Sequence, residues 1–368
     1  MSDDDIPEPD RIAGAPHPRE TQTLFGQAKA EADFLEAFTA GRMHSGWLIT
    51  GPRGVGKATL AWKIATFLLA DEGVGLFGDP SLAVDPDHPD ARLITAGAHP
   101  RLSLIRRPWD EKTKKLKSEI TVDAVRNLKK FFHMSAADGG RRVVIVDAAD
   151  ELNRNAANAI LKELEEPPLG ATMLLVAHQP SRLLPTIRSR CRELRCNRLN
   201  ADDLQQALTQ AGHPSDQSQS LATLAGGSAG DAIRLLNHDG LPLYAELVRT
   251  LDGLPQIDRP SALRLADACA GRGADVRFGL TLDLIDLFLS RAARAGLMGE
   301  PTAQGAPNEA RLLARMSPND RAARRWAQLQ QDLTERSRHG RAVILDPAAL
   351  ILDMIFKIED TARATVAA

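Results

Sequence analysis

The chain has 368 residues, enough for two or three domains that each bury a core, so a disulfide-stapled miniprotein is excluded. Hydrophobic residues make up 43% and charged residues 26%, a composition typical of a folded globular protein and not of a disordered or fibrous one. The 46 basic and 48 acidic residues give a net charge of −2, which excludes a general basic field for non-specific duplex binding. Any contact with nucleic acid must therefore be local. Aromatic residues, at 4%, argue against a dedicated single-strand binder.

Cysteine usage and hydropathy indicate the compartment. The three cysteines, Cys191, Cys196 and Cys269, form no CxxC pair and have no histidine at zinc-ligand spacing, so we interpret them as reduced thiols. The acidic start of the chain lacks the basic and apolar regions of a signal peptide. Aspartates interrupt the most apolar stretch, 278–289, and no run reaches the ~18 residues of a membrane span. We expect a cytoplasmic protein without membrane contact.

Composition changes along the chain predict four segments. Residues 1–20 carry acids and four prolines, which predicts a tail or an extended strap with little order before Thr21. In 21–197 short apolar runs alternate with helical patterns, which is typical of a parallel sheet with crossover helices. Strand signals nearly vanish afterwards, which predicts a small helical bundle at 198–240 and a larger one at 241–368. The predicted strands are 47–50, 93–95, 143–146 and 173–177.

One charged insertion interrupts the first half. Residues 101–117 hold seven basic and two acidic residues, a net charge of +5. Leucines at 102 and 104 on one side, and Leu116, Ser118 and Ile120 on the other, predict a hairpin with lysines at its tip. Two interpretations stay open: a solvated loop, or a tip that contacts phosphates or a partner.

The strongest local signal is a glycine-rich loop, Gly51-Pro52-Arg53-Gly54-Val55-Gly56-Lys57, between an apolar strand and a helical pattern. Gly51, Gly54 and Gly56 allow backbone amides to wrap an anion, and Lys57 is placed to reach terminal phosphates. A glycine-rich turn without ligand is the alternative. Position 58 should carry the hydroxyl that holds Mg²⁺, but it is Ala58, and Thr59 lies ~100° further round the helix.

A second element of such a site is an apolar strand that ends in an acid. Val143-Val144-Ile145-Val146-Asp147 supplies it, and Asp147 is the candidate for holding a metal-bound water. Hydrolysis requires a carboxylate just beyond this aspartate, but Ala148 follows and the next acid is Asp150. The loss of both the hydroxyl and the base predicts a site that keeps the structure of a phosphate-binding loop but does not catalyse hydrolysis.

Two longer strings are more specific than the loop. The segment 153–168 contains Leu164-Glu165-Glu166-Pro167-Pro168, and Ser189-Arg190-Cys191 follows it. Together they resemble the clamp-loader AAA+ ATPases of bacterial DNA polymerase III, over about residues 20–240. The resemblance implies a RecA-like AAA+ α/β domain with a parallel sheet, followed by a three-helix lid and an all-α collar for oligomerisation. It also implies that Arg190 acts as an arginine finger on the nucleotide of a neighbouring subunit.

Departures from the family pattern refine this expectation. Active relatives carry a γ-phosphate-sensing arginine in the lid string, where Gly227-Ser228-Ala229-Gly230-Asp231-Ala232 places Gly230. His178 stands where active members show a small polar residue. The region of the family's four-cysteine zinc module, roughly 75–95, has no cysteine, so we expect no zinc. We expect weak or absent binding of ATP or ADP at Gly51, Gly54, Gly56, Lys57, Thr59 and Asp147.

These features favour a non-hydrolysing stator subunit of the clamp loader. Its expected partners are the tau/gamma ATPase subunits and the delta subunit, with the sliding clamp and primer-template DNA reached through the complex. Two alternatives stay open: an active ATPase subunit of the tau/gamma kind, and a stand-alone nucleotide-binding regulator. ATP hydrolysis by the pure chain distinguishes the first alternative, and failure to bind the loader subunits distinguishes the second.

Overall fold

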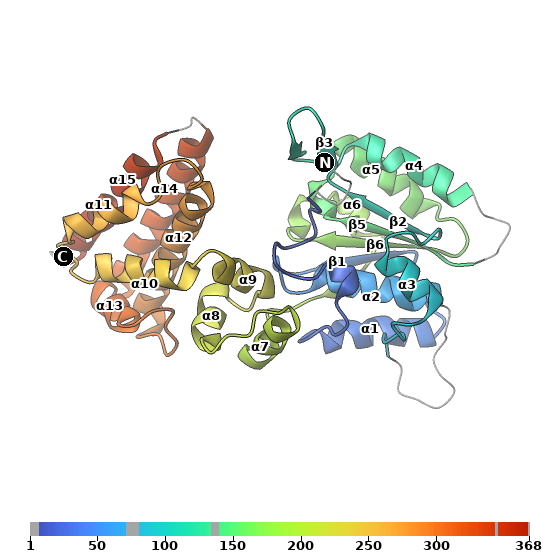
Figure 1. Ribbon diagram of the computed structural model, residues 1–368, viewed down its shortest axis with the longest axis horizontal. Coiled ribbons are helices and arrows are strands. Elements are labelled where there is room, and N and C mark those ends of the chain that lie inside the picture. The colour runs from blue at the N-terminus through green and yellow to red at the C-terminus, as the bar shows by residue number, and fades with distance from the viewer. Residues whose placement is uncertain (1–6, 71–80, 134–139, 343–344, 367–368) are drawn as a thin grey trace. The chain divides into compact units, whose positions relative to one another are not determined.

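The computed structural model describes residues 7–70, 81–133, 140–342 and 345–366. The chain divides into two compact units. Unit 1 comprises Met1–Ser215 and Gly227–Ile233, and unit 2 comprises Asp216–Gly226 and Arg234–Ala368. The sheet lies in unit 1, and the described part of unit 2 is helical, as the loss of strand signals after residue 197 predicts (Figure 1).

Unit 1 is built on a five-stranded sheet in the order β2-β5-β6-β1-β7. Every neighbouring pair is parallel. The carboxyl ends of all five strands therefore meet at one edge, which is where ligands bind in open α/β sheets. The strands are β1 Gly46–Thr50, β2 Leu102–Arg106, β5 Arg142–Asp147, β6 Ala171–Ala177 and β7 Arg192–Arg195.

Helices cover both faces of the sheet, which explains why the central strands are apolar throughout. Alternate residues of each strand, such as Ile49 and Val143, pack with α1 and α2, whereas their neighbours Leu48 and Val144 pack with α4 and α5 (Figure 1). Two buried cores therefore lie on opposite sides of the sheet. The helices of this unit include α1 Ala28–Thr39, α2 Lys57–Ala70, α3 Pro89–Thr95, α4 Val122–His133, α5 Arg154–Glu165, α6 Pro185–Arg188 and α7 Ala201–Gln210.

Three of the four predicted strands are confirmed as β1, β5 and β6. The strand predicted at 93–95 is wrong, because these residues form the last turn of α3. This helix begins after His88, whose side chain accepts the Asp90 N–H, and Pro89 occupies its first position. The sequence therefore contained the signals for the start of a helix, but the short apolar run at 93–95 favoured a strand.

The predicted hairpin is smaller than expected. Its first arm was wrong, because the segment with Leu102 and Leu104 is β2 and pairs with β5 in the main sheet. The hairpin itself joins β3 Trp109–Asp110 to β4 Lys115–Leu116, with Trp109 opposite Leu116. Its turn carries the lysines, as the sequence predicts.

The expectation of little order before Thr21 is wrong for residues 7–20, and the strap interpretation describes them better. A 3₁₀ turn forms at Pro18–Glu20, and the side chain of His17 is fully buried against Trp62 of α2. Ion pairs of Glu8 and Asp10 with Arg106, which composition does not show, attach this segment to β2. Residues 1–6 lie outside the described residues.

Unit 2 is held by an apolar core around the fully buried side chains of Tyr244, Phe288 and Trp326. Its longest helices, α12 and α14, pack against each other. None of the described helices, α12 included, is long and apolar enough to cross a bilayer. The remaining helices of the chain are α8 Ser218–Ala225, α9 Ala229–Asn237, α10 Gly240–Leu251, α11 Arg259–Asp267, α12 Asp275–Met298, α13 Glu309–Met316, α14 Asp320–Ala342 and α15 Pro347–Val366.

Candidate nucleotide site and interface arginine

The glycine-rich loop connects β1 to α2 at the carboxyl edge of the sheet. Gly51, Gly54 and Gly56 have φ values of 142°, 72° and 98°, a region that side chains disfavour. A Cβ atom on Gly51 would also lie 2.3 Å from the carbonyl oxygen of Cys196. The loop therefore has the strand–turn–helix setting and the backbone conformation of a phosphate-binding loop, and its glycines cannot be replaced without moving the chain.

Lys57 is turned inward. Its side chain belongs to a residue that is only 3% exposed, and its Nζ donates a hydrogen bond to the carbonyl of Pro52 within the same loop. Burial lowers the pKa of Lys57 to about 8, despite the opposing charges of Asp147 and Asp150. Thr59 lies half-buried on the first turn of α2. The ammonium group that the sequence assigns to phosphate binding thus donates a hydrogen bond to the loop itself.

Asp147 is the last residue of β5 and is buried. Burial and the negative charge of Asp10 raise its pKa to about 7, although Lys57 acts in the opposite direction. The charge of Lys57 therefore acts on Asp147, and both residues belong to the candidate site named from the two motifs. Burial makes the carboxylate form of Asp147 less favourable than that of an exposed aspartate.

Asp150, the acid that follows, is engaged elsewhere. Its two carboxylate oxygens accept the backbone N–H groups of His178 and Gln179 at 2.9 Å and 3.0 Å. This contact ties the end of β6 to the turn after β5. Burial and the charge of Lys57 lower the pKa of His178 to about 4, so its imidazole is neutral. We therefore interpret Asp150 as a strand-end clamp and not as the base that activates water.

The start of α9 packs directly on the glycine-rich loop. The N–H of Gly230 donates to the carbonyl of Gly54 at 3.0 Å. A Cβ on Gly230 would lie 2.9 Å from Gly54 Cα and 2.8 Å from Ile12 Cδ1. The sequence shows only that an arginine is missing at this position, whereas the structure shows that no side chain fits there.

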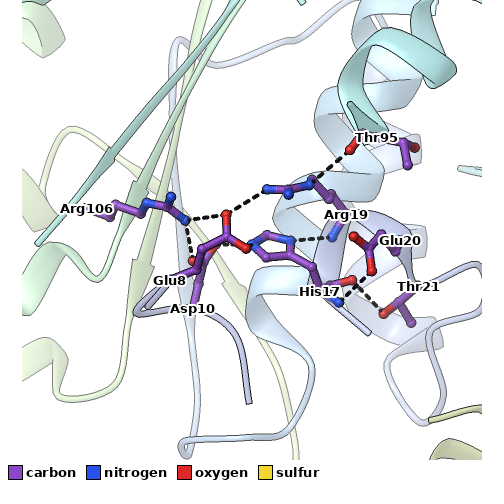
Figure 2. Close-up of polar contacts among 8 residues, drawn as sticks. All are labelled: Glu8, Asp10, His17, Arg19, Glu20, Thr21, Thr95 and Arg106. Atoms are coloured by element: carbon purple, nitrogen blue, oxygen red, sulfur yellow. Dashed lines mark hydrogen bonds and ion pairs between the residues drawn. The ribbon is translucent and has the colours of Figure 1, made fainter. Parts of the chain in front are cut away.

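The N-terminal strap, residues 7–20, reaches the same edge of the sheet (Figure 2). Arg106, the last residue of β2, lies 3.1 Å from Glu8 Oε1 and 2.8 Å from Asp10 Oδ1. Asp10 Oδ2 also lies 3.0 Å from the buried His17 Nε2, and Arg19 lies 3.0 Å from Glu8. Burial raises the pKa of Asp10, but the contacts with His17 and Arg106 outweigh it and lower the value.

The sequence did not predict this cluster, because its composition indicated a tail or a strap with little order before Thr21. Arg106 and Asp10 are 96 residues apart, so no local spacing relates them. The strap brings Ile12 against Gly230 and Asp10 toward Asp147. It thereby covers the part of unit 1 where the glycine-rich loop, Asp147 and the start of α9 meet.

Arg190 lies between α6 and β7, with its side chain 37% exposed. Its carboxylate partner comes from another element: Arg190 Nη2 lies 2.8 Å from Glu165 Oε1 of α5. Its Nη1 also donates to the Thr186 carbonyl at 3.1 Å. Glu165 is the last residue of α5, and Pro167 ends that helix beside the arginine loop. The two strings that carry the family resemblance therefore meet in space.

A five-stranded parallel sheet with a glycine-rich loop after β1, an acid at the end of β5 and an exposed arginine before β7 is the arrangement of a P-loop α/β domain. Residues 26–200 match the family model described as DNA polymerase III, delta subunit. Over that segment the chain is similar to clamp-loader subunits of DNA polymerase III, delta' subunits among them.

Three matches show the range of similarity. The chain is 38% identical to the DNA polymerase III subunit delta' of Pseudomonas aeruginosa over 58% of its length and 60% of that protein's. It is 28% identical to the DNA polymerase III subunit gamma of Buchnera aphidicola over 60% of its length and 58% of that protein's. The Thermotoga maritima RuvB Holliday junction branch migration motor aligns with a TM-score of 0.40 and 15% identity, covering 76% of this chain and 80% of that one. The matches to the two curated relatives thus span about 60% of each.

Proposed function

We propose that this chain is the delta'-type stator of a DNA polymerase III clamp loader, a subunit that does not hydrolyse ATP itself. The observation that carries the proposal is the contact between Gly230 and Gly54, which places backbone where active relatives hold a phosphate-sensing arginine. Lys57 supports it, because its Nζ is engaged with the loop's own carbonyl. Asp150, the next acid after the missing base, supports it too, because its carboxylate holds the N–H groups of His178 and Gln179.

In this proposal the exposed Arg190 is the functional group. An arginine finger stabilises the charge that develops on a transferred phosphoryl group, and it can be contributed in trans. Arg190 is held by Glu165 across a surface ion pair, which contributes only about 0–1 kcal/mol and so opposes little when the arginine moves to another partner. The partners are the tau/gamma ATPase subunits and the delta subunit, and the clamp and primed DNA are reached through them.

Two measurements test the proposal. The isolated chain should turn over ATP below ~0.1 per second, far under the 1–10³ per second of typical enzymes. It should also co-purify with tau/gamma and delta subunits when all are mixed in equal amounts. Faster turnover would favour an active ATPase of the gamma kind, to which the chain is also similar, and failure to assemble would favour a stand-alone regulator.

A further inference from the structure

The N-terminal strap meets the candidate nucleotide site at two places. Ile12 reaches the point where the start of α9 packs on the glycine-rich loop, because a Cβ on Gly230 would lie 2.8 Å from Ile12 Cδ1 and 2.9 Å from Gly54 Cα. Asp10 lies close enough to the end of β5 for its negative charge to raise the pKa of Asp147. In P-loop proteins these two elements hold the phosphates and the metal of a nucleotide. The strap therefore covers the elements to which a nucleotide would bind.

The chain that follows this cover is fixed to unit 1 by separate contacts. His17 is fully buried and packs edge-to-face on Trp62 of α2, with ring centroids 5.6 Å apart. Further along, Gln27 Nε2 donates a hydrogen bond to the Val55 carbonyl at 3.0 Å. Residues 7–16 can therefore leave the site while the segment that follows them stays attached.

Polar contacts hold the first part of the strap in place. Each residue from 7 to 14 is at least partly exposed. Arg106 lies 3.1 Å from Glu8 and 2.8 Å from Asp10, and Asp10 also lies 3.0 Å from His17 Nε2 (Figure 2). Segments with few buried apolar contacts open at a lower free energy than the core does. The ion pairs with Arg106 are therefore the contacts whose loss should open the cover.

We propose that the strap is an autoinhibitory cover of the nucleotide site: when closed it keeps ATP from the glycine-rich loop, and when open it lets ATP bind. The loop retains its glycine conformations and Lys57, which is what binding requires. Opening the strap restores neither the hydroxyl absent at Ala58 nor the base absent at Ala148. The open form therefore binds ATP without hydrolysing it.

Arg106→Ala tests the cover, because it loosens the strap and also removes a positive charge beside the site. Arg106 is the neighbour of Asp147 in the register of β2 and β5. Removing a cation by itself weakens the binding of an anion, so tighter binding of ATP can come only from opening. Loss of the charge-assisted contacts should raise the open fraction about 5- to 150-fold, and the apparent affinity rises equally while the closed form dominates. Calorimetry of the full chain with ATP and Mg²⁺ at pH 7.5 measures this gain.

A second variant separates opening from charge. Glu8→Gln combined with Asp10→Asn loosens the strap from its own side and makes the site more positive, so it should also bind ATP at least about 5-fold more tightly. Arg92→Ala breaks an exposed ion pair of unit 1 and should leave the affinity unchanged. The proposal is overturned if Arg106→Ala binds ATP no more tightly than the wild type, whether or not the double variant gains affinity from its charge. ATP turnover and assembly with loader subunits are separate readouts, so this proposal and the proposed function can fail independently.

Discussion

Glu165 and Arg190 show how two sequence strings act as one structural feature. Both residues are exposed. Glu165 ends α5 and Arg190 lies between α6 and β7, yet their side chains lie 2.8 Å apart. The string around Glu165 ends a helix with two prolines, and the string around Arg190 leads into β7. Their contact holds the arginine side chain against the chain's own surface.

Arg190→Ala should leave the isolated chain nearly as stable as the wild type, because exposed surface changes alter the free energy of unfolding by about ±0.5 kcal/mol. In a reconstituted loader, DNA-stimulated ATP hydrolysis and clamp loading should fall, by up to 10³–10⁵ at the served site before dilution by the other sites. Arg188→Ala, at an exposed position two residues earlier, is the matched control. Clamp loading at the wild-type rate by the Arg190→Ala complex would reduce this string to a structural turn.

Asp147 gives the fold a dependence on pH. Burial and Asp10 raise its pKa from 3.8 to about 7, so the folded chain holds a proton that the unfolded chain has released. Stability from this group is present below pH 4 and is lost as pH rises toward 7. Asp147→Asn should flatten the pH dependence of the unfolding free energy between pH 4.5 and 8, measured by urea denaturation. An unchanged slope would show that the carboxyl is charged in the folded state.

At the scale of elements, the sequence predicted the centre of the sheet better than its edges. β1, β5 and β6 are central strands, and their continuous apolar runs reflect burial on both faces. The two edge strands are β2, which the sequence analysis assigned to a hairpin, and β7, which it did not predict. Edge strands are half-solvated, so β7 reads Arg-Glu-Leu-Arg, with a single buried leucine.

The candidate site divides in the same way. The glycines, Lys57 and Asp147 follow from local strings, because a phosphate-binding loop is a local structure. The contact of Gly230 with Gly54 and the ion pairs of the strap join segments far apart in sequence, so no spacing predicts them. The contacts that close the site could therefore be identified only from the structure.

Gly230→Arg tests whether the site is closed by packing. An arginine there would restore the family string, but its Cβ meets the backbone of Gly54, which cannot yield as a side-chain tip would. We expect a loss of about 1–3 kcal/mol in stability and no gain in ATP binding. Asp231→Arg places the same side chain at the next, exposed position and should cost less. Restored nucleotide affinity in calorimetry would contradict the packing argument.

Arg106→Ala tests the strap. The change leaves the fully buried Asp10 with His17 as its remaining close ionic partner, and one lost charge-assisted contact of this kind costs about 1–3 kcal/mol. Hydrogen exchange should accelerate in residues 7–20 more than in β1 or β5. Arg92→Ala breaks an exposed pair with Asp87 and is the control, with an expected cost below about 1 kcal/mol. Equal protection of the strap in both variants would show that Arg106 does not hold it.

At the scale of the whole molecule, each compact unit contains its own cluster of buried ion pairs and hydrogen bonds. In unit 1 this is the strap cluster, and in unit 2 it is Glu309, the fully buried first residue of α13. Glu309 accepts hydrogen bonds from the Tyr244 hydroxyl, the Gly305 N–H and the Arg291 guanidinium. The shortest donor–acceptor distance to each of these three groups is 2.5 Å. These contacts join α10, α12 and the start of α13 around one carboxylate.

Glu309→Ala should therefore destabilise unit 2 specifically. Removing one member of a buried pair leaves Arg291, whose side chain is 11% exposed, without its charge partner, and such losses cost about 3–5 kcal/mol. Hydrogen exchange should accelerate in α10, α12 and α13 while the strands of unit 1 keep their protection. Glu246→Ala breaks the half-exposed pair with Arg277 in the same unit and should cost less than about 1 kcal/mol. Because collars join loader subunits in the proposed function, Glu309→Ala should also weaken co-purification with tau/gamma. If the two variants lose equal stability, the buried carboxylate does not organise unit 2.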